Sequence, residues 1–172
     1  MERNVPPDQI AVRVMFTIRN DGRNKQRILE DILRSGLVIQ ERAEELINAP
    51  DFSDEDTAPQ YGFGIINVND IALPKVFFQS MINRSRERGF SQMTPRAALL
   101  LIEQFPLEML VHRQFTLLHK PVDLQRVHNT ERTHKYCLRL AQRDDSPYLG
   151  VTRVETGREV FPGSSFLFAA ST

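Results

Sequence analysis

The segment between residues 128 and 136 holds the side chains best suited to acid–base chemistry at neutral pH. It contains the imidazoles of His128 and His134, and Lys135 follows directly after the second of them. Metal-independent cleavage of RNA needs a base for the 2′-hydroxyl, an acid for the leaving oxygen and a cation for the charged phosphorane. One hypothesis is therefore a small ribonuclease or related phosphoryl-transfer enzyme with His128, His134 and Lys135 as catalytic residues. Loops that lead into strands are commonly polar, so a solvated surface explains the same segment.

A group of arginines forms a second candidate site. Arg84, Arg86 and Arg88 fall at the end of a predicted helix, where the helix dipole favours cations without any ligand. Arg84 and Arg88 share one face of that helix, because residues four apart lie one above the other. Arg96 and Arg132 continue the basic bias along the chain. Together these residues predict a surface that contacts either the phosphates of a nucleic acid or the carboxylates of a protein partner.

The charges are distributed unevenly along the chain. Residues 1–74 carry 8 Lys or Arg against 13 Asp or Glu, and residues 75–172 carry 14 against 9, so that the formal net charge is zero. A zero net charge argues against a dedicated non-specific nucleic-acid binder. The acidic half (1–74) and the basic half (75–172) either compensate each other when they pack or leave a basic face for an anionic partner.

The counts and spacing of metal-binding residues disfavour a metal site. Cys137 is the single cysteine, which excludes an intramolecular disulfide and a four-cysteine zinc site. His112 and His119 lie seven residues apart on a predicted helix, so about 10 Å of helix axis separates them and one ion cannot bridge them directly. We therefore predict no metal and no cofactor.

The termini and the composition bear on location. The chain begins Met-Glu-Arg-Asn without an apolar segment, and it holds no run of about 18 apolar residues. Its 41% hydrophobic and 26% charged residues are typical of a globular protein. We expect a cytoplasmic protein that does not enter a membrane.

Hydrophobic periodicity predicts the elements that position these side chains. Period-two alternation predicts strands at residues 10–18, 61–68, from 136 onwards, at 149–154, 159–161 and 166–170, with a hairpin turn at 155–158. Apolar residues at three- and four-residue spacing predict a helix that Asn24 caps and Ser35-Gly36 ends, and a second helix that runs to about Asn48. Three more helices are predicted after Pro74, Pro95 and Pro106. Asn24 and Thr94 are the expected caps of two of these helices.

The resulting order is β-α-α-β-α-α-α-β-β-β-β, with about five helices between early and late strands. This order favours an α+β fold with a mixed or mostly antiparallel sheet. We expect one globular domain over residues 1–172, and we identify no family resemblance in its motifs. Because no catalytic motif is complete, the leading hypothesis is a non-enzymatic binding or assembly subunit that engages a protein or nucleic acid through its basic half. The apolar helices are also compatible with a homo-oligomer.

Overall fold

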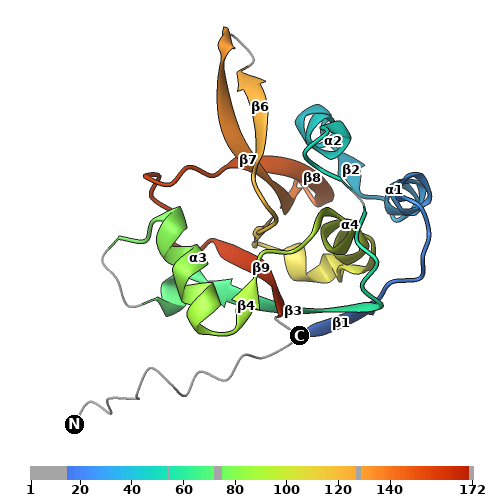
Figure 1. Cartoon of the computed structure of the whole chain (residues 1–172), viewed down its shortest axis with the longest axis horizontal. Coiled ribbons are helices and arrows are strands. Elements are labelled where there is room, and N and C mark those ends of the chain that lie inside the picture. The colour runs from blue at the N-terminus through green and yellow to red at the C-terminus, as the bar shows by residue number, and fades with distance from the viewer. Residues whose placement is uncertain (1–14, 54, 72–74, 127–128, 171–172) are drawn as a thin grey trace.

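The computed structural model describes residues 15–53, 55–71, 75–126 and 129–170. Within them, four α-helices accompany one nine-stranded sheet in the order β1-β3-β9-β5-β7-β8-β2, with β4 beside β9 and β6 beside β7 (Figure 1). The pairs β2–β8 and β5–β9 are parallel and the others are antiparallel. The predicted class, an α+β fold with a mixed sheet, is confirmed.

The bounds of the elements follow the chain. The helices are α1 (Lys25–Arg34), α2 (Glu41–Asn48), α3 (Phe78–Glu87) and α4 (Pro95–Gln104), with short 3₁₀ turns η2 (Val68–Asp70) and η3 (Leu107–Leu110). The strands are β1 (Phe16–Arg19), β2 (Val38–Ile39), β3 (Gln60–Asn67), β4 (Phe90–Ser91), β5 (Phe115–Leu117), β6 (Val122–Arg126), β7 (Asn129–Arg143), β8 (Ser146–Arg153) and β9 (Ser165–Ala170).

Capping side chains begin two helices where the sequence predicts them. Asn24 accepts a hydrogen bond from the Arg27 amide at the start of α1, and Thr94 accepts one from the Ala97 amide at the start of α4. Such caps satisfy amides that have no partner inside the helix. At the other end of α1, Gly36 adopts a φ of 86°, a left-handed conformation that glycine takes without steric cost.

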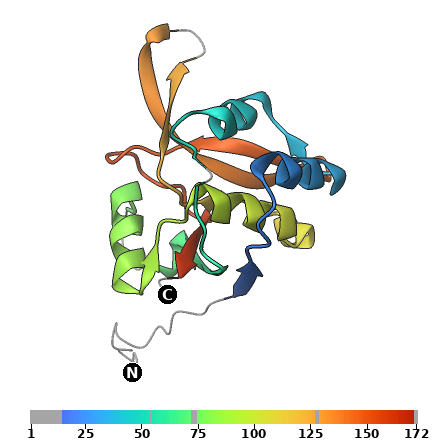
Figure 2. The same ribbon diagram turned by 45° about the vertical axis from the view of Figure 1, so that its right-hand side comes forward.

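Buried side chains form a hydrophobic cluster on each face of the sheet. The larger cluster joins the sheet to α1, α2 and α4, and the second joins it to α3. The hairpin of β6 and β7 projects from this body (Figure 1, Figure 2). No helix in the described part of the chain is long and apolar enough to cross a membrane.

Two predictions about residues 107–161 are wrong. The helix predicted after Pro106 is the short turn η3 followed by β5, whose residues are all buried. Apolar residues close together in the sequence occur in buried strands and in buried helices alike, so the spacing of Leu110, Phe115 and Leu118 does not distinguish the two. The predicted hairpin at 155–158 is also absent: β8 pairs with β7 through Asp144 and Asp145, which both have positive φ. Residues 154–164, which we call the strap, instead connect β8 to β9.

A buried imidazole stabilises the middle of β7. His119 is fully buried; its Nε2 accepts a hydrogen bond from the Leu138 amide at 3.0 Å, and its Nδ1–H donates to the Lys120 carbonyl at 2.8 Å. Leu138 lies between the part of β7 that pairs with β6 and the part that pairs with β5. The ring therefore supplies the acceptor for an amide at the change of partner strand.

This arrangement predicts acid sensitivity. Burial lowers the pKa of His119 from 6.5 to about 4. Between pH 6.5 and pH 4, His119 is protonated in the unfolded chain but neutral in the folded chain. The stability contributed by the neutral ring is therefore complete above pH 6.5 and is lost as the pH falls towards 4. The expected slope is about 1.4 kcal/mol per pH unit in that window.

Urea unfolding at pH 7.5, 6 and 5 would measure the slope. His119→Gln should be less stable at pH 7.5 and should have a smaller slope, because it removes the titrating ring. His112→Gln, which removes an exposed imidazole, is the control and should keep the slope. An unchanged slope in His119→Gln would contradict the assignment.

Candidate functional site

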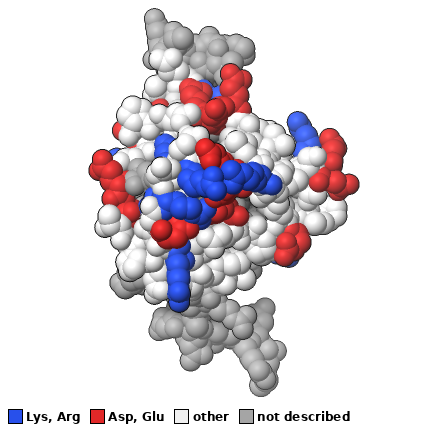
Figure 3. Space-filling view, turned by 90° about the vertical axis from the view of Figure 1, so that its right-hand side faces the viewer, with Lys and Arg blue, Asp and Glu red and all other residues white. Residues whose placement is uncertain are grey.

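The arginines around α1 are neutralised by carboxylates of the same chain. Arg23 contacts Asp21 at 2.6 Å, Asp31 at 2.5 Å and Glu103 at 2.7 Å. The hydrogen bond to Glu103 is the main cause that raises the pKa of Arg23. Figure 3 shows this side of the molecule, where Lys and Arg lie among Asp and Glu. This surface is therefore a poor phosphate-binding face.

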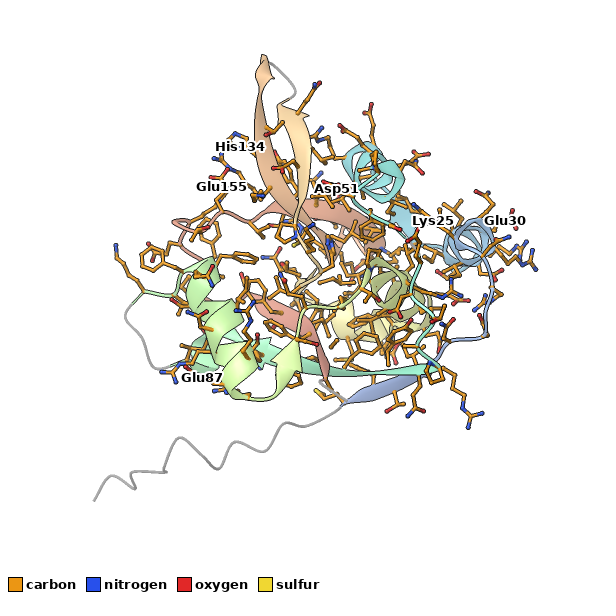
Figure 4. All side chains as sticks on the ribbon, in the orientation of Figure 1. Lys25, Glu30, Asp51, Glu87, His134 and Glu155 are labelled. Carbon is orange, nitrogen blue, oxygen red and sulfur yellow. The ribbon has the colours of Figure 1, made fainter. Side chains whose placement is uncertain are left out.

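The predicted arginine cluster at the end of α3 is exposed but has a local partner. Arg84 contacts Glu87 at 3.1 Å, and both side chains are largely in solvent. Arg86 is exposed and Arg88 is half-buried. Figure 4 labels Glu87 at this end of the helix. The cluster lies on the surface, where the helix dipole accounts for its cations.

Arg96 and Arg132 do not extend that cluster in the described structure. Arg96 is only 5% exposed; it donates to the Asn20 side-chain oxygen at 2.8 Å and to the Arg23 carbonyl at 2.5 Å. It thereby anchors the loop between β1 and α1 to α4. Arg132 lies in β7, but its side chain is outside the described part of the structure.

The structure separates the residues of the predicted catalytic segment. His128 lies outside the described residues. Lys135 approaches Asp123 at 3.5 Å on β6, and consecutive residues of a strand point to opposite faces. His134 therefore points away from Lys135, and its Nδ1 lies 2.5 Å from the Glu155 carboxylate.

His134 belongs instead to a network with Glu155 and Arg153. The second Glu155 oxygen accepts a hydrogen bond from Arg153 at 2.6 Å, and Figure 4 shows Glu155 next to His134 at the base of the β6–β7 hairpin. The hydrogen bond from Arg153, followed by that from His134, lowers the pKa of Glu155. Glu155 is therefore a carboxylate that fixes the orientation of the imidazole.

Arg153 also lines a cavity that the sequence does not reveal. The cavity has a volume of about 170 Å³ and lies between the sheet, the start of α3 and the strap. We call it the Arg139 pocket. Its polar lining includes Thr116, Arg139, Thr152, Arg153, Arg158 and Ser164, and its apolar lining includes Phe78, Val160, Phe161 and Phe166.

Strand register assembles the polar wall of the pocket. Arg139 on β7 lies opposite Thr116 on β5, and Cys137 lies opposite Thr152 on β8. Because side chains alternate along a strand, Arg139, Thr116 and Thr152 share the face that carries Cys137. The strap covers this face, and its Val160 N–H donates a hydrogen bond to the Val76 carbonyl at 2.7 Å.

Arg139 is a half-buried cation without a carboxylate. Its guanidinium approaches only neutral groups: Gln114 at 3.4 Å, the Tyr148 hydroxyl at 3.3 Å and, at 5.9 Å, the centre of the Tyr148 ring. These hydrogen bonds are long. No described residue forms an ion pair with Arg139, and its Nε has no hydrogen-bond partner there.

An unsatisfied polar atom belongs to the wall of this pocket. Among the described residues, four buried side-chain atoms lack a hydrogen-bond partner, and three of them are Arg139 Nε, Arg153 Nε and His134 Nε2. The fourth is the Tyr61 hydroxyl, whose pKa burial and the nearby Asp56 raise to about 12. Buried polar atoms are normally hydrogen-bonded. Arg153 lies opposite Tyr136 and Arg139 lies opposite Gly150, so the two arginine side chains leave opposite faces of the sheet. The unsatisfied Nε of Arg139, on the face of the pocket, therefore indicates a site for an acceptor.

The other chemical groups give no second site. Cys137 is buried, and burial raises its thiol pKa, so it is not a reactive thiolate. No group of three His, Cys, Asp or Glu in the described ranges is arranged to hold a metal ion. One signal for Arg139 is present in the sequence: it lies between Cys137 and Ala141, both buried on the same strand face.

Arg139, which is half-buried, and Arg96, which is buried, should respond differently to truncation. Arg139→Met keeps the aliphatic part of the side chain and removes a charge that has no counterion. We therefore expect the free energy of unfolding to be unchanged or about 1 kcal/mol higher. Arg96→Met removes the donor for Asn20 and the Arg23 carbonyl, so we expect a loss of about 2 kcal/mol or more. Urea denaturation at pH 7.5 measures both, and a strongly destabilised Arg139→Met would indicate a structural role.

Comparisons with known proteins provide no relative from which a function is transferred. No protein-family model matches the chain, and neither a curated protein nor a solved structure matches it. The residues of the Arg139 pocket are therefore the basis for the functional assignment.

Proposed function

We propose that this chain is a non-enzymatic binding or assembly subunit that holds a carboxylate of a partner protein in the Arg139 pocket. The observation that carries the proposal is the unsatisfied Nε donor of Arg139, a half-buried cation that forms no ion pair with any described residue, at one small cavity. The proposal keeps the basic half of the chain as the binding half. The residues that contact the partner are then those of the sheet face under the strap, and not the arginines of α3.

The groups of the pocket suit a carboxylate. A guanidinium presents its N–H groups in a planar fork that matches the two oxygens of a carboxylate. The hydroxyls of Thr116 and Thr152 donate from the same wall. Arg153 and Arg158 add positive charge, whereas Glu159 is the one acidic residue in the described lining and lies 3.7 Å from Lys75.

The size of the pocket favours a protein side chain or chain end over a nucleic-acid backbone. Its volume of about 170 Å³ is below the roughly 300–1,000 Å³ typical of small-molecule sites. A phosphodiester has a nucleoside on each side, whereas a carboxylate ends a short aliphatic stem. The apolar wall of Phe78, Val160 and Phe166 provides contacts for such a stem.

The alternative of a phosphoryl-transfer enzyme has support from one contact. Glu155 orients His134 as a carboxylate orients the histidine of a general-base pair. The proposed mechanism also needs a second acid–base group and a cation. Because Lys135 lies on the other face of β7 beside Asp123, the described geometry favours binding over catalysis.

The proposal predicts saturable carboxylate binding by Arg139. Titration of ¹⁵N-labelled protein with glutarate at constant ionic strength should shift the Nε–H signal of Arg139. Arg139→Met should weaken binding by roughly tenfold to a hundredfold, because a hydrogen bond to a charged group contributes about 1.5–3 kcal/mol.

The matched control for this titration is Arg143→Gln. Arg143 lies on the same strand, is exposed and is not part of the pocket lining. Its loss should leave the glutarate affinity unchanged. Shifts that never saturate, or equal affinity in Arg139→Met, would exclude the pocket as a carboxylate site.

A second experiment addresses nucleic acid as the partner. Fluorescence anisotropy of single-stranded RNA should show no saturable binding at near-physiological salt, because the α1 arginines are paired and the pocket is too small for a phosphodiester. Tight, salt-sensitive binding that Arg84→Glu with Arg88→Glu abolishes would contradict the proposal and assign the α3 face to RNA.

A further inference from the structure

A groove between α1 and α2 leaves apolar side chains uncovered. Its volume is about 290 Å³, and its lining includes Leu29, Leu33, Ile39 and Ile47, together with Glu30 and Glu44. Leu33 is 57% exposed, and Val38 in the neighbouring edge strand β2 is 56% exposed. Exposed apolar residues that adjoin one another in this way are typical of interaction sites.

The rim of this groove is acidic. Glu30 forms ion pairs with Arg27 at 3.1 Å and with Arg34 at 3.8 Å, both on its own helix. Glu44 is exposed, and no described cation forms an ion pair with it. The groove lining itself contains no Lys or Arg, so an apolar partner group with a cation beside it fits best.

The strap presents such a group. Phe161 is 69% exposed, the largest exposed fraction among the exposed large hydrophobic residues of the described chain, and Phe77 is 38% exposed. Both belong to the neighbourhood of the Arg139 pocket: Phe161 lines it, and Phe77 pairs with Glu159 of the strap. Arg158 lies in the same strap and is exposed. The two glutamates of the strap have partners: Glu155 pairs with Arg153 at 2.6 Å and Glu159 with Lys75 at 3.7 Å. The strap therefore combines an apolar projection with the charge of Arg158.

We infer that the partner is a second copy of this chain, whose α1–α2 groove receives Phe161 and whose Glu44 supplies the carboxylate to the Arg139 pocket. This inference rests on the proposed function, because it names the source of the carboxylate. Charge complementarity supports it: the groove lining carries Glu30 and Glu44 and no cation, whereas the pocket lining carries three arginines and one glutamate. Aromatic and arginine side chains are also the commonest anchors of protein interfaces.

The two surfaces lie on opposite sides of one molecule. Figure 4 places Glu30, on α1, on the right and Glu155, at the start of the strap, on the left. One copy therefore cannot satisfy both surfaces by itself. Contacts between two different surfaces are heterologous, and they produce closed rings or open filaments rather than a two-fold dimer.

Two single substitutions test this geometry. Leu33→Asp disables the groove and leaves the strap intact, and Phe161→Asp does the reverse. Sedimentation equilibrium should show that the unmodified chain grows beyond a dimer as its concentration rises, and that each variant alone stays monomeric. A mixture of the two variants should form a dimer and stop there, because only one groove and one strap remain functional.

Val111→Asp is the matched control, since Val111 is 52% exposed but lies in neither surface. It should associate like the unmodified chain. Glu44→Lys should weaken self-association by at least tenfold, and Arg139→Met should weaken it by a similar factor.

The outcomes separate this inference from the proposed function. If glutarate binds Arg139 while the chain stays monomeric at every concentration, the second-copy inference is overturned and the carboxylate site stands. If glutarate does not bind, the proposed function fails and the named carboxylate contact fails with it. Association that persists in both single variants, or that is unchanged in Arg139→Met, also overturns the inference.

Discussion

The structure depends on the hydrogen bond from the Leu138 amide to the His119 imidazole. The 15-residue strand β7 pairs with β6 near its start and with β5 near its end, and Leu138 lies where one partner gives way to the other. An amide buried at that position without an acceptor would cost about 1–3 kcal/mol. The neutral ring removes this cost and connects the chain after β5 to the centre of the sheet. Arg139 is the next residue, so the same bond helps to fix the register that places Arg139 opposite Thr116.

The sequence predicts the parts of the fold that local chemistry determines. Asn24 and Thr94 begin α1 and α4 as expected, because a capping side chain needs only amides of its own helix. The failures involve long-range pairing. β5 is central to the sheet and all three of its residues are buried, so its apolar Phe115 and Leu117 fit a buried helix equally well. The hairpin at Asp144 and Asp145 was missed because its backbone conformation, with positive φ, is less often adopted by aspartate than by glycine.

The candidate site was harder to predict than the fold because it depends on which cations lack partners. The sequence draws attention to Arg84, Arg88 and Arg96, but the structure pairs the first with Glu87 and buries the third in hydrogen bonds. The sequence signal for Arg139, its place between Cys137 and Ala141 on one strand face, is weak, since an arginine in a strand usually faces solvent. Only the register of three strands shows that it shares a covered face with two threonines. The net charge does not distinguish Arg139 from an arginine in an ion pair, because every arginine contributes the same charge.

A half-buried arginine without a carboxylate is costly in the isolated chain. Removing a charge from water is unfavourable unless another charge or several good hydrogen bonds compensate, and the two hydrogen bonds of Arg139 are long and involve neutral groups. A hydrophobic side chain would fill the same position beside Phe78 and Phe166 without that cost. We propose that this cost is compensated in a complex. An anion that enters the pocket would give the Arg139 Nε an acceptor and its charge a counterion, which would couple the affinity of the site to the same burial that makes the free protein less stable.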